Sequence, residues 1–578
     1  MAKPTLANYI EGAVLRLRQA ASDELHATSL YRAIVFSGPA PLLHKPWPSR
    51  PASPNLERGE EIAGGMLYLA GRKLNFENVP EAWSALTPSR TFAISLHSFG
   101  WLSSLSRFER KQQQPPVLTK SHVDTWIEQF GSWNRFAWSA AITAQRCLAW
   151  LGESKVLFSG DAIATSTRLD SLGKQLRHLK SVANICEAGE TRLWVAICLA
   201  TAGTCLFGMQ GLQKTGLAML QDELDRQILT DGGHIGRNPE VAALLLLELD
   251  ALAKLLDQHN SPPPIFIRKT RDKLLPFVRF CTTMNGRLAV FNGGGYGDKT
   301  AIHHALSAID EKRSPFLIAP HSGYHRLQTR RSTLILDCGK MPPIAYSRNA
   351  HAGALSFEFG TRAGTIITNC GWSQDLSEKW REPSRTSAAH STLVIDDVSS
   401  SYIYPKGLTT SLLGTIAYNK EQALQARRNE EESGVWLTAS HQEYLSRYGL
   451  QHNRRLFLST SGDDLRGEDT LERPVGLGKT RDLQPIPFSI RFHLHTDTRV
   501  SLARNNSSVL ILLPNGEGWR FRCDIGSISL EPSVYLGSGA PPRRSKQIVL
   551  NGAADPNGIG QEASNRIRWS LRRIESNS

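Results

Sequence analysis

Hydrophobic residues recur with two different periods along this chain of 578 residues, and that change most constrains its fold. Up to about residue 270, apolar residues recur every three or four positions, which is typical of amphipathic helices. A Ser-Pro-Pro-Pro sequence at 261–264 then ends the helical pattern. Because short polar or Gly-containing turns separate the helices, we expect helical hairpins arranged as a solenoid or toroid. The clearest predicted helices are residues 123–151, 169–186, 191–209, 214–228 and 239–259.

From about residue 316, apolar and polar residues alternate, and Gly, Asn and Asp punctuate the segments. An Asn-Gly-Glu-Gly sequence at 515–518 between two such segments is a clear hairpin signal. About ten strands or more without intervening helices predict an antiparallel β-sandwich. The predicted organisation is a helical domain at 1–265, a connector at 266–315, a sandwich at 316–565 and a polar tail at 566–578.

The charge balance is strongly basic, because 67 Lys and Arg residues against 53 Asp and Glu residues give a formal net charge of +14. Such a surface favours an anionic partner: an acidic polysaccharide, a nucleic acid or an anionic membrane. A solvated basic surface without any such partner explains the charge equally well. The chain carries no zinc-finger, helix-turn-helix or RNP-type motif, so only its charge favours nucleic acid.

The N-terminus and the cysteines bear on where the protein works. No run of about 18 apolar residues exists, so we predict no transmembrane segment. Residues 1–26 lack a continuous apolar core and a cleavage site, so we predict an amphipathic helix and no signal peptide. This favours a cytoplasmic protein, or a start site that misses an upstream signal. The eight cysteines form no Cys-x-x-Cys pair, so we expect buried thiols and no thiolate zinc site.

Four polar segments stand out from these patterns. Asp-Gly-Gly-His at 231–234 precedes a very apolar helix, and SGYHRLQ at 322–328 opens the β half. The third segment, 351–397, holds two alternating stretches that each begin beside a lone histidine, with Asn-Cys-Gly between them. The fourth, 440–459, groups histidine, tyrosine and arginine around two strands. A β-structure would bring such histidines from separate strands to one spot.

The order DGGH, SGY, HAGALSF, AHSTLVIDD resembles the heparinase II/III-like family of polysaccharide lyases. The resemblance is densest from about 320 to 550 and, with the preceding helices, covers most of the chain. It implies an N-terminal (α/α) toroid and a C-terminal antiparallel β-sandwich. It also implies a carbon-oxygen lyase that performs β-elimination on an acidic, uronic-acid-containing glycan of the heparin/heparan or alginate type. The implied location, the periplasm or bacterial cell envelope, conflicts with the missing signal peptide.

This chemistry needs a base for the proton α to the uronate carboxylate, an acid for the leaving oxygen, and positive charge near the developing enolate. On the resemblance, His234 is the proton-transfer or carboxylate-contact residue, and Arg237 is the carboxylate clamp. Tyr444 or Tyr324 is the candidate acid or base. The alternatives are that His234 caps a buried helix and that Tyr324 packs with its hydroxyl on a backbone group.

Two positions depart from the family pattern. Where lyases of this family commonly have a tyrosine two residues after the proline, this chain has Val241, which cannot exchange a proton. Where they carry an Asn-His pair, the comparable site reads Gly-Glu-Thr at 189–191. Both departures favour the alternative function, a non-catalytic protein that binds an acidic glycan or the envelope and keeps the fold.

The β half carries the remaining predicted contacts. Some relatives hold zinc through two histidines and a carboxylate; His351 and His390 match the histidines, and Asn369 takes the carboxylate position. A neutral amide makes a weaker zinc site than a carboxylate does. Zinc is therefore the one cofactor that the sequence suggests, and no cofactor is firmly implied. The predicted substrate contacts are His441, Arg454 and Arg455, although the two arginines occupy adjacent strand positions and therefore face opposite sides. The sequence leaves the oligomeric state open.

Overall fold

The computed structural model describes residues 4–43, 46–47, 54–307, 315–419, 424–477, 484–539, 541–557 and 565–574. The chain divides into two compact units. The helical unit contains Leu6–Ile228 and Leu244–Asp272, and the β unit contains Leu229–Ala243 and Lys273–Ser578 together with the first five residues. The predicted boundary at 265 therefore differs from this division, because the DGGH turn belongs to the β unit.

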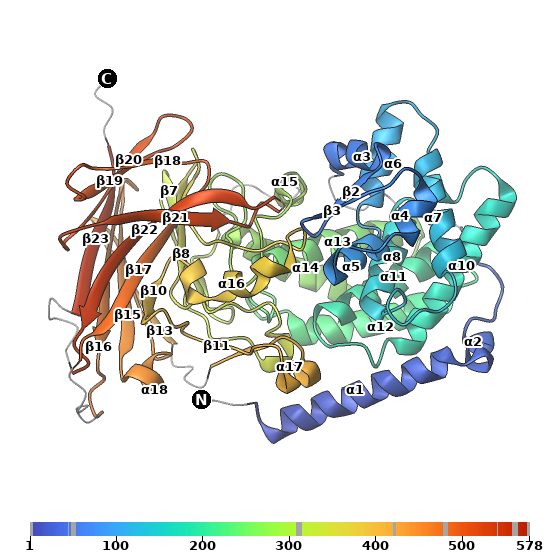
Figure 1. The fold of residues 1–578 in the computed structure, drawn as a ribbon, viewed down its shortest axis with the longest axis horizontal. Helices are drawn as coiled ribbons and strands as arrows, with labels where there is room; N and C mark the ends of the chain where they lie inside the picture. The colour runs from blue at the N-terminus through green and yellow to red at the C-terminus, as the bar shows by residue number, and fades with distance from the viewer. Residues whose placement is uncertain are drawn as a thin grey trace. The chain divides into compact units, whose positions relative to one another are not determined.

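The helical unit consists mainly of helices (Figure 1). Two short strand pairs lie among them, β1 (Leu42–Leu43) with β4 (Leu206–Phe207) and β2 (Met66–Leu69) with β3 (Arg72–Asn75). Polar residues begin several of the helices: the Asp161 carboxylate accepts a hydrogen bond from the backbone N–H of Ala164 at 2.7 Å, at the start of α10. The predicted helix at 123–151 is wrong, because a turn at 131–139 divides it into α7 and α8. Up to residue 228 the helices are α1 (Leu6–Ala27), α2 (Ser29–Val35), α3 (Leu56–Ala63), α4 (Val79–Ser84), α5 (Arg90–Ser98), α6 (Leu102–Lys111), α7 (Val117–Phe130), α8 (Ala140–Gly152), α9 (Ser154–Leu157), α10 (Ala162–Val182), α11 (Glu190–Cys205) and α12 (Gln210–Gln227).

Two glycines explain how closely α11 and α12 pack. A Cβ on Gly203 would lie 2.1 Å from the backbone N of Gln213, and one on Gly216 would lie 2.3 Å from the backbone N of Ala200. Any side chain there would force the helices apart. Almost every residue of α11 from Leu193 onward is buried, so this helix forms the centre of the unit's core.

Helix α1 presents its apolar side to solvent. Leu6, Ile10, Val14, Leu17 and Leu25 are 75%, 54%, 42%, 70% and 51% exposed, and their spacing places them on one side of the helix. Its other side makes polar contacts within the helical unit. Among the residues that the structure describes, no helix is both long enough and apolar enough to cross a membrane.

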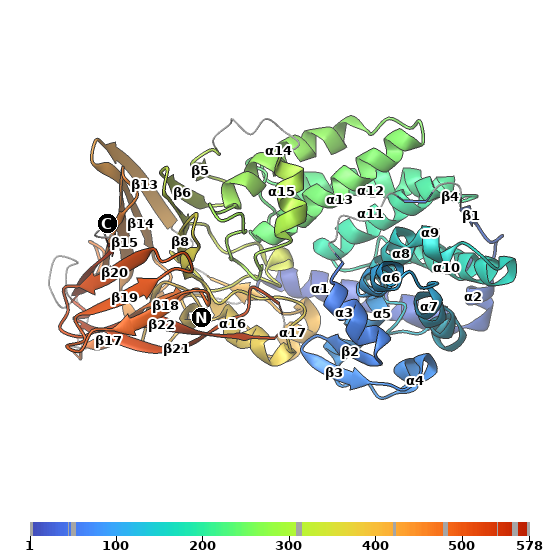
Figure 2. The same cartoon turned by 90° about the horizontal axis from the view of Figure 1, so that it is seen from above.

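The β unit is built mainly from two antiparallel sheets (Figure 2). A separate two-stranded sheet pairs β11 (Tyr402–Ile403) with β12 (Ala417–Tyr418). The first of the two main sheets has nine strands in the order β21-β22-β17-β9-β8-β7-β6-β5, with β10 paired to β17; the second has eight in the order β13-β14-β15-β16-β23-β20-β19-β18. The strands are β5 (Ile318–Ala319), β6 (Tyr324–Gln328), β7 (Ser332–Asp337), β8 (Phe357–Thr361), β9 (Thr365–Thr368), β10 (Leu393–Ile395), β13 (Leu424–Glu431), β14 (Gly434–His441), β15 (Gln451–Ser459), β16 (Asp464–Glu472), β17 (Ile486–Leu494), β18 (Arg499–Leu502), β19 (Ser508–Leu512), β20 (Gly518–Cys523), β21 (Ser529–Tyr535), β22 (Arg543–Ala554) and β23 (Arg566–Arg573).

One hydrophobic core fills the space between these sheets. Its members include Leu334 and Ile490 from the first sheet and Leu456, Phe521 and Trp569 from the second. This arrangement confirms the predicted antiparallel sandwich. The sandwich also has shorter helices at its margin, including α16 (Arg381–Arg385), α17 (Leu408–Leu413) and α18 (Leu445–Tyr448).

Two predicted boundaries of the β half are wrong. The tail predicted at 566–578 begins with β23, which lies between β16 and β20 near the middle of the second sheet. Its inward residues Ile567, Trp569 and Leu571 are buried, while arginines alternate with them. The connector predicted at 266–315 includes most of α14 (Ile265–Cys281) and all of α15 (Lys299–Ser307); α13 (Pro239–Gln258) begins directly after the DGGH turn.

Candidate functional site

The DGGH turn is held by the carboxylate of its own aspartate. Asp231 accepts hydrogen bonds from the backbone N–H groups of Gly233, His321 and Ser322 at 3.1, 2.8 and 2.7 Å, and from the Ser322 hydroxyl at 2.7 Å. Gly232 has φ +87°, and a Cβ there would lie 2.0 Å from the carbonyl oxygen of Lys273. The turn therefore fastens to the loop before β6 and requires glycine.

His234 lies inside this turn and is 3% exposed. Its Nδ1 accepts a hydrogen bond from the backbone N–H of Gly236 at 3.1 Å, so Nδ1 carries the lone pair. Burial lowers the pKa of His234 to about 4 and keeps the imidazole neutral at pH 7. These contacts match the alternative of a turn histidine, whereas the catalytic role stays a prediction.

Arg237 forms a buried ion pair with Asp337, the last residue of β7. Its Nε donates to the carbonyl oxygen of Ser322 at 2.8 Å, and its Nη1 donates to that of Lys340 at 3.1 Å. Burial alone would lower the pKa of Arg237, but the Asp337 carboxylate raises it above its ordinary value. The guanidinium predicted to hold a substrate carboxylate thus holds a carboxylate of its own chain.

Tyr324 uses its hydroxyl on the backbone of this same group. The hydroxyl donates to the carbonyl oxygen of Arg237 at 2.6 Å and accepts from Asn292 Nδ2 at 2.9 Å. Burial raises the pKa of Tyr324 well above its ordinary value, so the phenol stays protonated. Asn292 also accepts from the backbone N–H of His351 at 3.3 Å, and so links this group to the histidines of the β half.

His351 and His390 meet directly. Nδ1 of His351 lies 3.2 Å from Nε2 of His390, whose Nδ1 lies 2.7 Å from the carbonyl oxygen of Thr386. A carbonyl only accepts, so His390 Nδ1 carries the proton, its Nε2 accepts, and His351 Nδ1 donates. The lone pair of His351 is then on Nε2. Burial lowers the pKa of His390 to about 4, and burial, His390 and nearby arginines lower that of His351 well below its ordinary value.

Asn369 does not join the two imidazoles as a third ligand. Its Oδ1 accepts from the backbone N–H of Ser391 at 2.9 Å, and its Nδ2 donates to the carbonyl oxygen of Val290 at 3.0 Å. The described residues contain no group of three or more His, Cys, Asp or Glu side chains suited to a metal ion. Two imidazoles without a third anionic or nitrogen ligand do not make the usual protein zinc site, so the predicted zinc does not fit this donor set.

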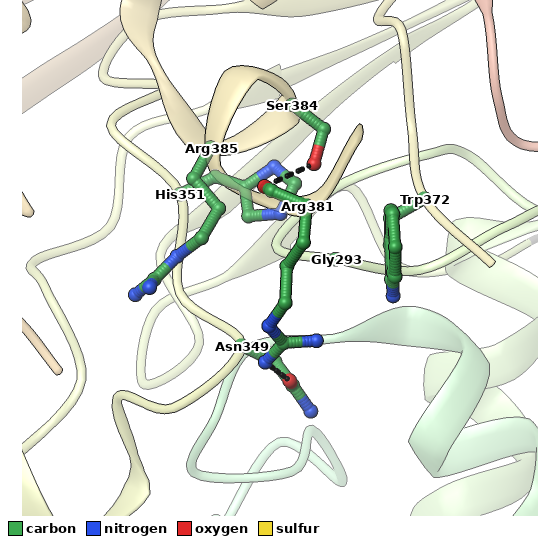
Figure 3. A pocket seen from close by; sticks show the side chains of 7 residues that line it. All are labelled: Gly293, Asn349, His351, Trp372, Arg381, Ser384 and Arg385. Carbon is green, nitrogen blue, oxygen red and sulfur yellow. Dashed lines mark hydrogen bonds between the residues drawn. The ribbon is translucent and has the colours of Figure 1, made fainter. Parts of the chain in front are cut away.

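A narrow hollow lies beside His351 (Figure 3). It has no room for a water-sized sphere. Arg381 Nη2 donates to Asn349 Oδ1 at 2.8 Å, and the guanidinium lies 5.7 Å from the ring centre of Trp372. The other lining residues are Gly293, Ser384 and Arg385. The sequence analysis did not single out Arg381 or Arg385, because they lie between the two alternating stretches of the third segment.

Two of the three residues predicted for substrate contact, His441 and Arg454, lie in the sandwich core. His441 Nε2 is 3.1 Å from His452 Nδ1, and His452 Nε2 is 2.8 Å from Asp469. Arg454 donates to Asp469 through Nε at 2.7 Å and Nη2 at 3.2 Å, and Trp569 Nε1 donates to it at 3.0 Å. Although burial alone would raise the pKa of Asp469, Arg454 and His452 hold it below its ordinary value.

The other two predicted residues of this segment point elsewhere. Tyr444 is 2% exposed, and its hydroxyl donates to the carbonyl oxygen of Val398 at 3.2 Å. Arg455 is exposed on the opposite side of β15 from Arg454, with its guanidinium 4.0 Å from the ring centre of Trp436. The adjacent arginines face opposite sides, as predicted, and the three residues proposed for substrate contact do not line one surface.

Comparisons with known proteins match this architecture. Residues 311–570 match the model of the heparinase II/III-like C-terminal domain. FtsZ-localized protein C of Caulobacter vibrioides is 34% identical over 549 residues, which span 94% of this chain and 92% of that protein. A crystal structure of heparinase III has a TM-score of 0.62 at 17% identity and covers 88% of this chain and 80% of its own. A heparan sulfate lyase HepC mutant from Pedobacter heparinus has a TM-score of 0.57 at 13% identity, and the match covers 100% of this chain and 92% of the HepC chain.

The two solved structures are too distant in sequence to show more than the fold, and they confirm the predicted helical toroid followed by an antiparallel sandwich. The relative from Caulobacter vibrioides extends the similarity over nearly the whole chain. This protein therefore belongs to the heparinase II/III-like family.

Proposed function

We propose that this protein is a non-catalytic member of its family that binds at the cell envelope. One observation carries the proposal: all four side chains predicted for proton transfer or carboxylate binding are buried and bonded within the chain. His234, Arg237, Tyr324 and Tyr444 are 3%, 6%, 0% and 2% exposed. An acid or base must come within hydrogen-bond reach of the substrate, about 2.6–3.2 Å. Val241, at the position where a tyrosine is common, is 5% exposed and supplies no proton.

The discriminating experiment measures the absorbance of unsaturated uronate while the full-length protein meets heparin, heparan sulfate, alginate or hyaluronan. We expect no signal at protein concentrations where an active heparinase III gives a strong one. Turnover on any of these glycans that His234→Ala lowers by about 100-fold would contradict the proposal. A circular dichroism spectrum of that variant controls for unfolding.

Elimination on an acidic, uronic-acid-containing glycan is the second candidate, and the hollow beside His351 favours it. The unprotonated Nε2 of His351 has no hydrogen-bond partner among the described residues, and Arg381 and Arg385 line the same hollow. A neutral imidazole beside positive charge suits removal of a proton α to a carboxylate. The hollow as it stands has no room for a sugar ring, which is why we rank this function second. An elimination activity at this hollow predicts an unsaturated-uronate signal that His351→Ala abolishes and that His234→Ala leaves unchanged.

Helix α1 supports attachment to a lipid surface. Its polar side holds it to the protein: Arg16 pairs with Glu187 at 3.2 Å, and Gln19 donates to the carbonyl oxygen of Ile185 at 3.1 Å. The exposed stripe Leu6, Ile10, Val14, Leu17 and Leu25 is left for another partner. An apolar stripe on a helix of a protein with net charge +14 suits insertion between anionic lipid headgroups.

The relative from Caulobacter vibrioides is named for its localization with FtsZ, and we propose that this protein also localizes with FtsZ.

Attachment of the protein to a lipid surface is tested by co-sedimentation of the full-length protein with anionic vesicles. The triple variant Leu6→Ser, Ile10→Ser, Leu17→Ser should lower the bound fraction by about 10-fold or more. The matched control is Leu86→Ser, Ile163→Ser, Leu408→Ser, which changes three leucine or isoleucine residues that are 94%, 79% and 87% exposed elsewhere. Equal loss in both variants would contradict attachment through α1.

A further inference from the structure

The outer face of the eight-stranded sheet carries a group of exposed arginines. We call this the arginine face: Arg499 on β18, Arg520 and Arg522 on β20, and Arg568 and Arg572 on β23. On β20 and β23 these residues alternate with buried apolar side chains of the sandwich core, among them Trp519, Phe521 and Leu571. The core thus fixes the direction of the arginines, and their charge is gathered on one solvated face.

Among the residues that the structure describes, three of these arginines have no ion-pair partner. Arg568 pairs with Glu468 at 2.7 Å, and Arg572 pairs with Asp464 at 3.2 Å. The side chains of Arg499, Arg520 and Arg522 make no hydrogen bond or ion pair with any residue that the structure describes. Moreover, Arg520 stands directly opposite Arg572 across the β20–β23 pair. Like charges directly opposite each other destabilise a sheet, so this position favours an anion beside Arg520.

Apolar side chains lie within the same face. Leu510 and Leu512 on β19 are 41% and 36% exposed. Leu510 is paired with Arg520 on one neighbouring strand, and Leu512 is paired with Arg499 on the other. Neighbouring strands are about 4.8 Å apart. Arginine and leucine positions therefore alternate across the strands at intervals of about 4.8 Å.

We propose that the arginine face binds an acidic peptide segment that also carries apolar side chains, supplied by a partner protein. Guanidinium groups bind carboxylates with two parallel hydrogen bonds, and the leucines give aliphatic side chains a surface to cover. In an extended peptide, alternate side chains on one face are about 6.6–6.8 Å apart, which matches the spacing of Arg520 and Arg522 along β20. A polysaccharide or a nucleic acid offers anions at such a face but no aliphatic side chains for Leu510 and Leu512. This binding is independent of α1 and of any elimination chemistry.

The test is fluorescence anisotropy of a short, labelled, end-capped peptide of Glu and Leu residues, titrated with the full-length protein. We expect saturable binding that weakens as salt is raised. Arg520→Glu with Arg522→Glu should weaken it by about 10-fold or more, and Leu510→Ser with Leu512→Ser by about 5-fold. The charge-matched control, Arg90→Glu with Arg107→Glu, reverses two exposed arginines of the helical unit and should change the affinity by less than about 2-fold.

Three results would overturn the proposal. The first is no saturable binding at low salt, and the second is an equal loss of affinity in the Arg520/Arg522 variant and in its control. The third is equally tight, Arg520-dependent binding of a Glu–Gly peptide, heparin, duplex DNA or anionic vesicles, which would mark a general polyanion or lipid surface. Circular dichroism and thermal melting of each variant establish that it is folded, so a lost interaction is not lost structure.

Discussion

The β unit contains two histidine pairs of almost the same geometry. His351 and His390 approach to 3.2 Å with their rings at 85°, and His441 and His452 approach to 3.1 Å with their rings at 88°. All four side chains are buried. A pair of neutral imidazoles joined by one hydrogen bond is therefore not, by itself, a sign of catalysis or of metal binding.

The pairs differ in what lies at their ends. The second pair ends on Asp469, whose carboxylate is also bonded to Arg454 and Trp569, so its donors and acceptors are used within the core. The first pair ends on a backbone carbonyl at one side and, at the other, on a nitrogen of His351 that faces the hollow. Position relative to solvent and charge separates a structural pair from a candidate site. Three pairs of substitutions can break or sharpen this contrast.

The largest effect is expected from Asp469→Asn. The substitution leaves Arg454, which is fully buried, without its counter-charge, and should lower the free energy of unfolding by about 3–5 kcal/mol. Urea denaturation followed by circular dichroism measures the change. Glu468→Gln is the control on the same strand, because its partner Arg568 is 57% exposed, and it should change the free energy of unfolding far less. Similar losses in both variants would mean that the second pair is not a structural charge network.

A smaller loss of folding stability is expected at acidic pH. The folded-state pKa of His390 lies near 4, below the ordinary value of 6.5, so the unfolded chain binds more protons between these pH values. Stability from this group is present above pH 6.5 and is lost as pH falls toward 4, by at most about 1.4 kcal/mol per pH unit.

His390→Gln should therefore flatten the dependence of unfolding free energy on pH in this window. Burial also lowers the pKa of His452, but Asp469 favours its charged form and opposes that shift. His452→Gln should accordingly flatten the dependence less, as measured by urea unfolding at a series of pH values. A larger flattening from His452→Gln would reverse the contrast between the pairs.

Sequence periodicity could predict most of the fold, because burial against a core leaves a repeating pattern in each element. It failed where polarity concealed that pattern. Residues 566–573 read Arg-Ile-Arg-Trp-Ser-Leu-Arg-Arg, and four arginines concealed the alternation of Ile567, Trp569 and Leu571. In the region of α7 and α8 the opposite occurred, since apolar residues continue across the turn at 131–139 and two helices looked like one.

The site was less predictable than the fold. Motif order indicated that His351 and His390 would approach each other, and they do. No local pattern, however, indicates that Asp337 pairs with Arg237, 100 residues away, or that Asn292 links Tyr324 to His351. Such partners are chosen by strand order and register, so a residue type suited to catalysis could not be distinguished from the same type used to satisfy a buried backbone group.

The smallest effect separates the two candidate tyrosines. Tyr324 is linked to His351 through Asn292, and Tyr444 lies beside His441. Tyr324 donates to a carbonyl oxygen at 2.6 Å and accepts from Asn292, whereas the Tyr444 hydroxyl lies 3.2 and 3.4 Å from two carbonyl oxygens. Tyr324→Phe leaves two buried polar groups short of a partner and should lower the unfolding free energy by about 1–3 kcal/mol. Tyr444→Phe loses longer bonds and should cost about 0.5–1 kcal/mol. If the uronate assay detects turnover in the unaltered protein and either variant abolishes it at unchanged stability, that tyrosine acts on substrate and its hydrogen bonds must open during the reaction.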